Sequence, residues 1–462
     1  MPPSFAPRRF LFVLWEGGGN VAPQLGLVRG LVERGHDVRV LTEDCLSGDV
    51  AAAGARFEPF ATAPNRASRS EDLIRDWEAR TPLGAFARGR DRVMMGPAAD
   101  YARDTSAALD RETVDALVCD YMLFGPPIAA EAAQVPGALI VHNVYMVPEP
   151  GKPAPGPGFL PARGPLGRAR DRAANRAFVA LFNRGLPAVN RARAEHGLRP
   201  LRHIVDQLEH LGLILVLTSE SFDFHGEAHP PQVRYVGPVL GDPEWVEGWH
   251  SPWPEDDDRP LVVVSLSSTY MAQERVLARV IEGLARLDAR VLVTTGPAMD
   301  PASLPSAANT VVVRSAPHAR LFEEAAVVVT HAGMGTVTRA LACGVPLVCL
   351  PMGRDQHDVA ARVVHAGAGV RLRSGARPQA IRAAVERVMS EPHFRARAGE
   401  LGDRMLADAA AQRGIDELEA LASGGHASGL SPPLTPHGRA TSGRDRQAVA
   451  GGRGRVSPSR RY

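Results

Sequence analysis

Short, continuously apolar runs that alternate with helical segments constrain the fold of this chain more than any other feature. The first run, residues 10–15, leads into a glycine-rich turn at residues 17–20. A segment with helical spacing then starts near Pro23, and residues 38–41 form the next apolar run. Continuous runs of this length are typical of strands that are buried on both faces of a parallel sheet. The sequence therefore predicts βαβ units and an α/β fold.

The alternation occurs in two series, which predicts two domains. At 462 residues the chain exceeds what one hydrophobic core usually supports. The first series extends to an apolar run at residues 213–218, and the second starts at residues 261–265 and closes with one predicted helix at residues 392–421. We expect two doubly wound Rossmann-like domains that face each other across a cleft. Their predicted bounds are residues 1–240 and 261–423, with a proline-rich linker at 241–260 and a disordered tail at 424–462.

The positive charge of the chain is concentrated in this predicted tail. The formal net charge is +2, but residues 424–462 carry seven Arg against the single Asp445, which leaves the preceding residues with a net charge of −4. The predicted domains therefore lack the basic excess of a nucleic-acid-binding protein. Contact of the arginines with a membrane surface is an alternative that no other feature of the sequence supports.

The cysteines and the N-terminal residues bear on the compartment. Four cysteines lie singly in or beside apolar runs, without the spacing of a metal site. The first apolar run is too short for a signal peptide or a membrane-spanning helix. We therefore predict a cytoplasmic protein without a metal ion.

Two loops of the second predicted domain carry the strongest chemical signal. The turn at residues 330–336 reads THAGMGT and joins a strand to a helix. Its small residues let the backbone approach a ligand, and a helix N-terminus offers unpaired N–H groups to an anion. His331 adds a donor that can neutralise a phosphate oxygen when it is protonated. The turn predicts a diphosphate site, although packing alone also explains many such turns.

The second loop ends in Asp355 and Gln356, directly after another apolar run. A carboxylate accepts hydrogen bonds from vicinal hydroxyls, and an amide both donates and accepts them, so the pair is suited to a sugar. Asp355 alone is equally explained as a helix cap. Both loops taken together favour a sugar diphosphate.

The order of these residues resembles the donor signature of family 1 glycosyltransferases, which have the GT-B fold. The resemblance extends from residue 7 to about residue 422 and includes Ala316-Pro317-His318, Gly344-Val345-Pro346 and Pro351. It implies a uridine or thymidine diphosphate hexose as co-substrate and no further cofactor. It also implies roles for individual residues: His331, Gly333, Gly335 and Thr336 on the diphosphate, Ser267 and Ser268 on a phosphate, Asp355 and Gln356 on the sugar, and the backbone around Ala316 on the base.

The sequence departs from the family pattern at three positions. Ser315 stands where plant members stack a tryptophan on the base, and Arg339 stands where they bind the ribose through a glutamate. Asn20 occupies the place of the histidine that serves as general base. An amide cannot take a proton at neutral pH, and loss of a general base costs on the order of 10²–10⁴ in rate.

Two other residues are candidates for the missing base. Asp120 matches the acid that orients the family's histidine, and it can act directly or through a water held by Asn20. His142, which follows the next apolar run, supplies an imidazole. We prefer Asp120 at this point, because an isolated histidine near a strand end is usually structural.

The sequence thus predicts inverting, metal-independent transfer of a hexose to the hydroxyl of a small-molecule acceptor. The acceptor, a hydrophobic natural product, lipid or peptide, is expected in the first domain near Asn20, Asp120, His142 and residues 148–193. Three alternatives stay open. They are a donor-binding auxiliary protein that Asn20 has made inactive, a sugar-nucleotide epimerase, and a dinucleotide oxidoreductase, whose glycine fingerprint is incomplete here.

Overall fold

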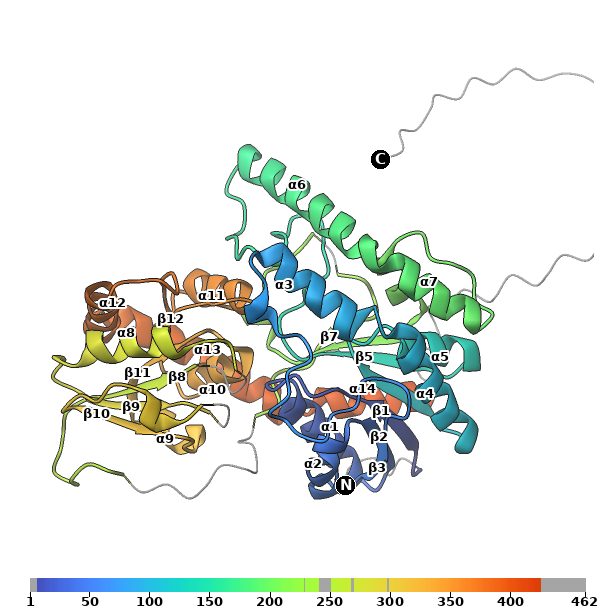
Figure 1. Cartoon of the computed structure of the whole chain (residues 1–462), viewed down its shortest axis with the longest axis horizontal. Coiled ribbons are helices and arrows are strands. Elements are labelled where there is room, and N and C mark those ends of the chain that lie inside the picture. Colours follow the sequence, from blue (N-terminus) through green and yellow to red (C-terminus); the bar gives the residue numbers. More distant parts are fainter. Residues whose placement is uncertain (1–5, 228, 241–250, 267–269, 297–298, 425–462) are drawn as a thin grey trace, which may run out of the picture. The chain divides into compact units, whose positions relative to one another are not determined.

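The computed structural model describes residues 6–227, 229–240, 251–266, 270–296 and 299–424 (Figure 1). Residues 241–250 of the predicted linker, Ser267, Ser268 and all of the predicted tail except Gly424 lie outside these residues. The described residues form two sheets in which every strand pair is parallel, with helices on both faces. The predicted α/β fold class is confirmed.

The first sheet has seven strands, whose central members are the predicted apolar runs. Residues 10–13 and all of the neighbouring strand at residues 116–120 are buried, because helices cover both faces. The spatial order is β3 (Arg56–Pro59), β2 (Asp37–Thr42), β1 (Arg9–Val13), β4 (Ala116–Asp120), β5 (Gly137–Val141), β6 (Leu213–Val216) and β7 (Val233–Tyr235).

Seven α-helices accompany this sheet among the described residues. The glycine-rich turn after β1 leads into the first of them, as predicted. The helices are α1 (Val21–Glu33), α2 (Ser47–Ala52), α3 (Pro82–Gly89), α4 (Ala98–Arg111), α5 (Pro126–Ala133), α6 (Pro165–Phe182) and α7 (Leu186–Glu195).

The second sheet repeats the plan with six strands in the order β10 (Thr310–Val313), β9 (Arg290–Thr294), β8 (Leu261–Ser265), β11 (Ala325–Thr330), β12 (Leu347–Cys349) and β13 (Gly369–Arg371). The helices that follow are α8 (Glu274–Leu284), α9 (His318–Glu324), α10 (Met334–Ala342), α11 (Gln356–His365), α12 (Pro378–Ser390), α13 (Pro392–Ala410) and α14 (Arg413–Ala422).

Each sheet has a topological switch point, where the strand order reverses. In the first sheet it lies between β1 and β4, and in the second it lies between β8 and β11. Ligands of open parallel sheets bind beyond the carboxyl ends of the strands at such points. The loops that carry Asn20 and His331 start there, and Asp120 is the last residue of β4.

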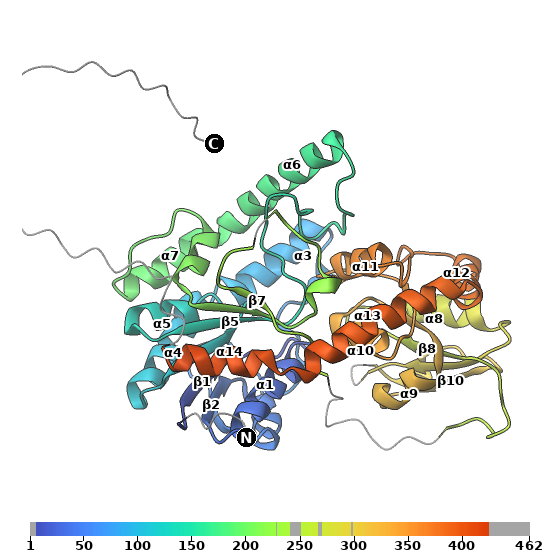
Figure 2. The ribbon, with the colours of Figure 1, turned by 180° about the vertical axis from the view of Figure 1, so that it is seen from behind.

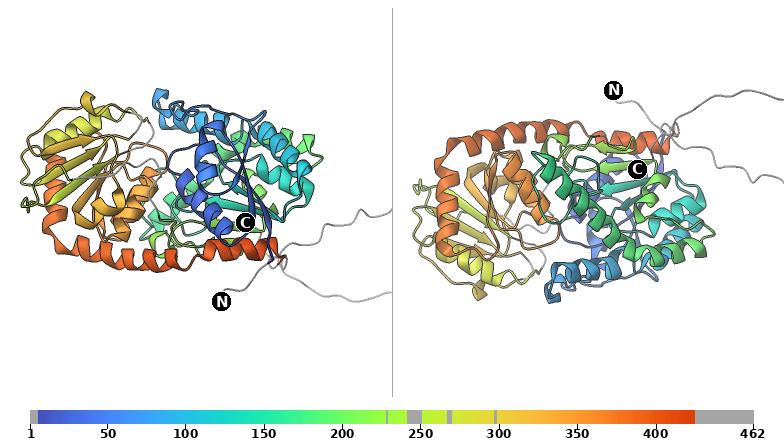
Figure 3. Two further views of the ribbon diagram at one scale, coloured as in Figure 1. Left: turned by 90° about the horizontal axis from the view of Figure 1, so that it is seen from below. Right: turned by 90° about the horizontal axis from the view of Figure 1, so that it is seen from above.

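Residues 392–421 are not one helix, as the sequence pattern predicts, but two. The helix is interrupted at Gln412, which has a left-handed φ of 49°. Beyond the break, α14 packs its apolar face into the core of the first sheet through Ile415, Leu418 and Leu421. Buried His36 lies 2.8 Å from Glu419 and adds a polar contact. Figure 2 shows α13 and α14 passing from the second sheet to the first, and the views in Figure 3 agree.

No helix in the described part of the chain is both long enough and apolar enough to span a lipid bilayer. All four cysteines are free, with Cys119 and Cys349 buried. The cytoplasmic location and the domain bounds stay predictions.

We expect Leu418→Ala to lower the free energy of unfolding by about 2–5 kcal/mol, because the side chain is fully buried and its removal leaves a cavity. Thermal unfolding of the full chain measures this as a lower apparent Tm. Leu406→Ala on α13 is the matched control, since Leu406 is 47% exposed. Equal Tm values for the two variants would contradict the packing of α14 on the first sheet.

Candidate active site

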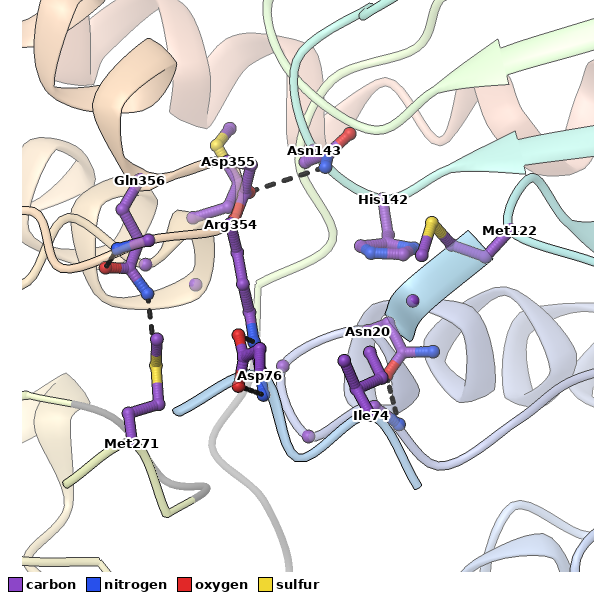
Figure 4. A pocket seen from close by; sticks show the side chains of 18 of the residues that line it. Asn20, Ile74, Asp76, Met122, His142, Asn143, Met271, Arg354, Asp355 and Gln356 are labelled. Atoms are coloured by element: carbon purple, nitrogen blue, oxygen red, sulfur yellow. Dashed lines mark hydrogen bonds and ion pairs between the residues drawn. The ribbon is translucent and has the colours of Figure 1, made fainter. Parts of the chain in front are cut away.

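A cavity of about 2780 Å³ is lined by residues from the carboxyl ends of both sheets (Figure 4). It contains all the predicted site residues that the structure describes except Asp120. The structure thus brings together Asn20, His142, Ala316, His331, Gly333, Gly335, Thr336, Asp355 and Gln356. Residues 154–157 and part of α6 also line it, within the region where the acceptor is expected.

The turn after β11 exposes the N-terminus of α10 to this cavity. Ala332 has a left-handed φ of 70°, and Gly333 occupies the N-cap position without a side-chain cap. A Cβ on Gly333 would lie 2.5 Å from Nε2 of His331, so any larger residue would force the imidazole or the turn to shift. Gly333 has no side chain with which to cap the first N–H groups of α10, and Gly335 and Thr336 line the cavity. This arrangement is suited to an anion.

His331 contributes to this turn as a neutral group. Burial and the nearby charge of Arg354 lower the pKa of His331 to about 4. At neutral pH the imidazole is therefore uncharged in this structure. It offers hydrogen bonds to a ligand and adds no positive charge of its own.

Asp355 and Gln356 have different surroundings. Asp355 is the N-cap residue of α11, but its carboxylate makes no capping hydrogen bond. It lies instead 3.4 Å from Nδ2 of Asn143, which belongs to the first sheet's side of the cavity. Gln356 accepts hydrogen bonds through Oε1 from the amides of Met352 and Gly353, at 2.8 and 3.1 Å. Asp355 thus occupies the N-cap position, as the helix-cap alternative predicts, but without a capping hydrogen bond from its side chain.

Asp120 is the centre of a buried polar cluster at the end of β4. Its side chain is 0% exposed. Oδ2 accepts hydrogen bonds from Asn20 at 3.0 Å and from Gln24 at 2.6 Å, and Oδ1 accepts one from the amide of Met122 at 2.9 Å. Burial raises the pKa of Asp120, but the neighbouring His142 and the hydrogen bonds from Asn20 and Met122 outweigh burial and lower it. The carboxylate is thus ionised and closed off from the cavity.

His142 lies between this cluster and the cavity. Its Nδ1 is 3.2 Å from Oδ2 of Asp120, an ion-pair distance, and its side chain is 15% exposed. Asn20 is in turn fully engaged, because its amide donates to Asp120 and to the carbonyl of Trp15 and accepts from the amide of Gly17. Asp120 and His142 are the two titratable residues among the three predicted catalytic residues, and the side chain of His142 is the more exposed of the two.

Sequence reasoning missed three residues that the structure brings into the site. Gln24 binds Asp120, and its position one helical turn after Asn20 was a signal that could have found it. Asn143 reaches Asp355, and its Oδ1 is buried without a hydrogen-bond partner among the described residues. Arg354 binds Asp76 across the cavity. No local pattern marks the last two, because their partners are distant in sequence.

The first sheet's side of the cavity is mostly apolar. Phe182 packs against Phe86 and Phe178 with ring centroids 4.9 and 4.4 Å apart. Further apolar side chains on this side are Leu73, Ile74, Met94, Met122, Phe124 and Met146.

Comparison with known proteins gives consistent matches. Residues 278–421 match the erythromycin biosynthesis protein CIII-like C-terminal domain. The chain is 32% identical over 432 residues to 4'-demethylrebeccamycin synthase of Lentzea aerocolonigenes. The matched region covers 89% of this chain and 99% of that protein. The solved kitacinnamycin glycotransferase has a TM-score of 0.71 at 22% identity, over 90% of this chain and 99% of its own. The glycosyltransferase VinC, solved in complex with dTDP, has a TM-score of 0.61 at 20% identity, over 90% and 100%.

The relative and the solved structures match over both sheets, and the family model covers the part of the chain that carries the donor signature of residues 316–356. The full-length relative establishes the family, and the solved structures establish the two-domain architecture. The chain therefore belongs to the natural-product glycosyltransferases of family 1, which have the GT-B fold.

Proposed function

We propose that this glycosyltransferase moves a hexose from a nucleotide diphosphate sugar to a hydrophobic small-molecule acceptor, with inversion and without a metal ion. The observation that carries the proposal is that one cavity is lined by the N-terminus of α10, by Asp355 and by His142, which is paired with Asp120. An anion site, a sugar-binding acid and a base are the three elements that such a transfer needs.

The donor is proposed to bind along the second sheet's side. The diphosphate would lie on the N-terminus of α10, where His331, Gly333, Gly335 and Thr336 meet the cavity. The helix dipole and N–H groups would stabilise the charge of the leaving diphosphate, which is why no metal ion is invoked. Asp355 and Nε2 of Gln356 would bind the sugar, and the backbone of Ala316 the base. A thymidine or uridine nucleotide is proposed, in line with the dTDP bound to VinC.

His142 is proposed as the general base, in place of the Asp120 that the sequence favours. Asp120 is fully buried and already bound by three donors, whereas His142 faces the cavity beside it. His142 would take the proton of the acceptor hydroxyl while the oxygen attacks the anomeric carbon. The bond to the diphosphate breaks in the same step, and the nucleotide leaves with the electron pair. A single displacement of this kind inverts the anomeric centre.

The acceptor is proposed to be largely apolar and rich in rings. The phenylalanine cluster of α3 and α6 and the methionines on this side would cover a flat, uncharged molecule. Membership in the glycosyltransferase family argues against the oxidoreductase and epimerase alternatives. The inactive auxiliary protein is an outcome of the turnover experiment below.

Gly333→Ala is expected to raise the Kd for dTDP or UDP at least tenfold, because the new methyl group collides with His331 and displaces the turn. Isothermal titration calorimetry measures the Kd. Gly399→Ala on α13 is the control, since nothing lies within 4 Å of its added Cβ. If the two variants bind the nucleotide equally well, the diphosphate does not lie on this turn.

His142→Ala is expected to lower kcat by about 10²–10⁴ with little change in nucleotide Kd, because it removes the base and not the donor site. Product formation from dTDP- or UDP-glucose with a panel of phenolic acceptors measures kcat, with His393→Ala on α13 as control, because the side chain of His393 is 56% exposed. Retained turnover in His142→Ala, together with its loss in Asp120→Asn, would make Asp120 the base. Turnover that is absent from the wild type and gained in Asn20→His would identify an inactive auxiliary protein.

The neutral His331 also predicts a dependence of stability on pH. Its pKa is about 4 in the folded chain, below the ordinary 6.5, so the unfolded chain binds more protons between these values. The contribution of His331 to the free energy of unfolding therefore increases by about 3 kcal/mol as the pH rises from 4 to 6.5. The same contribution is lost as the pH falls through this range. Urea unfolding of wild type and His331→Gln at pH 5 and pH 7 measures the difference. Equal pH dependence in both proteins would show that His331 is not buried in its neutral form.

A further inference from the structure

Arg354 extends from the donor loop to the other side of the cavity. It has a left-handed φ of 54°, which non-glycine residues adopt only where contacts hold them. Its guanidinium donates to both oxygens of Asp76, at 2.9 and 3.2 Å (Figure 4). It also donates to Oδ2 of Asp72 at 3.3 Å. Its neighbour Asp355 points toward Asn143 instead. Successive residues of one loop thus serve different sides of the cavity.

The two acidic partners lie on residues 72–77, which we call the wall segment. Asp72 is fixed within the segment, because its Oδ1 accepts hydrogen bonds from the amides of Ile74 and Arg75 at 2.8 Å each. Its Oδ2 is the atom that binds Arg354. A second contact joins the wall segment to the second sheet's side of the cavity. The rings of Trp77 and Tyr270 pack edge to face, with their centroids 5.2 Å apart.

This ion pair is better shielded than an ordinary surface pair. The side chains of Arg354, Asp72 and Asp76 are 24%, 18% and 10% exposed. The guanidinium binds one carboxylate through two nitrogens, which is the strongest geometry for such a pair. Arg354 is also close enough to the donor turn for its charge to lower the pKa of His331.

The wall segment forms part of the acceptor side of the cavity. Leu73, Ile74 and Trp77 line it, and so do Asn20, Met122 and His142; Figure 4 labels Ile74 and these three residues. Leu73 and Ile74 also pack against the core of the first sheet. An apolar acceptor that reaches His142 would contact these side chains.

We propose that Arg354 is a positioning residue for the acceptor, although it belongs to the donor loop. It fixes the wall segment through Asp76 and Asp72, so the apolar wall beside His142 is complete only when the donor loop holds it. This inference rests on the proposed function, because it assumes that the acceptor binds on the apolar side. Arg354 makes no contact with the diphosphate in this role. The donor affinity of the enzyme does not depend on it.

The test compares Arg354→Gln, Asp76→Asn and the double variant of the full chain, with exposed Arg373→Gln as control. Hydrogen exchange measured by mass spectrometry reports on the wall segment, and calorimetry gives the Kd of dTDP and of UDP. Fluorescence titration with 4-methylumbelliferone, a neutral aromatic phenol, probes the apolar side. We expect each single variant to exchange about tenfold faster in the wall segment and to bind the phenol more weakly. The double variant should be no worse than either single variant, and Arg354→Lys should restore part of the protection.

The donor readouts separate this inference from the function on which it rests. Nucleotide Kd should change less than threefold in every variant, and exchange in α10 should not change. Wall-segment exchange equal to wild type in both single variants would overturn the role of Arg354. Weaker nucleotide binding in Arg354→Gln, but not in Asp76→Asn, would make Arg354 a phosphate ligand and also overturn it. If the wild type binds neither dTDP nor UDP, the proposed function fails, whatever the wall segment does.

Discussion

The buried carboxylate of Asp120 determines how the first sheet's side of the site is built. A charge without access to water is costly unless donors surround it, and Asp120 has Asn20, Gln24 and a backbone amide. These donors come from the turn after β1, from α1 and from the loop after β4, so the carboxylate joins the elements at the switch point. His142 is a titratable neighbour of Asp120 that also lines the cavity.

The asparagine at position 20 has a clear structural function in this setting. Its Nδ2 donates to Asp120 and to the carbonyl of Trp15, and its Oδ1 accepts from Gly17. A histidine has no group that could make all three contacts at once. We infer that, with Asn20 in place of the family's histidine, the role of proton acceptor passes from the turn after β1 to His142, which directly follows β5. Asn20 then keeps Asp120 aligned with His142.

Much of the fold could be predicted from the sequence, because central strands of parallel sheets are continuously apolar. The edge strands β3, β7 and β13 are short or only partly buried, and their pattern was too weak to predict. The break at Gln412 was also missed. The break depends on the packing of α14 against the first sheet, and the apolar pattern of residues 392–421 does not indicate that packing.

The proposed donor residues could be identified from the sequence because they are contiguous in two loops of the second sheet. Our proposal of His142 over Asp120 as the base could not, since it depends on which side chain reaches the cavity. The pairing of Arg354 with Asp76 could not be predicted either, because it joins residues 278 positions apart.

The most direct measurement of the central claim is a crystal structure of the full chain with a dTDP-sugar bound. We expect phosphate oxygens within 3.2 Å of the first amides of α10 and the anomeric carbon facing His142. A diphosphate bound away from α10, or a sugar facing away from His142, would contradict it.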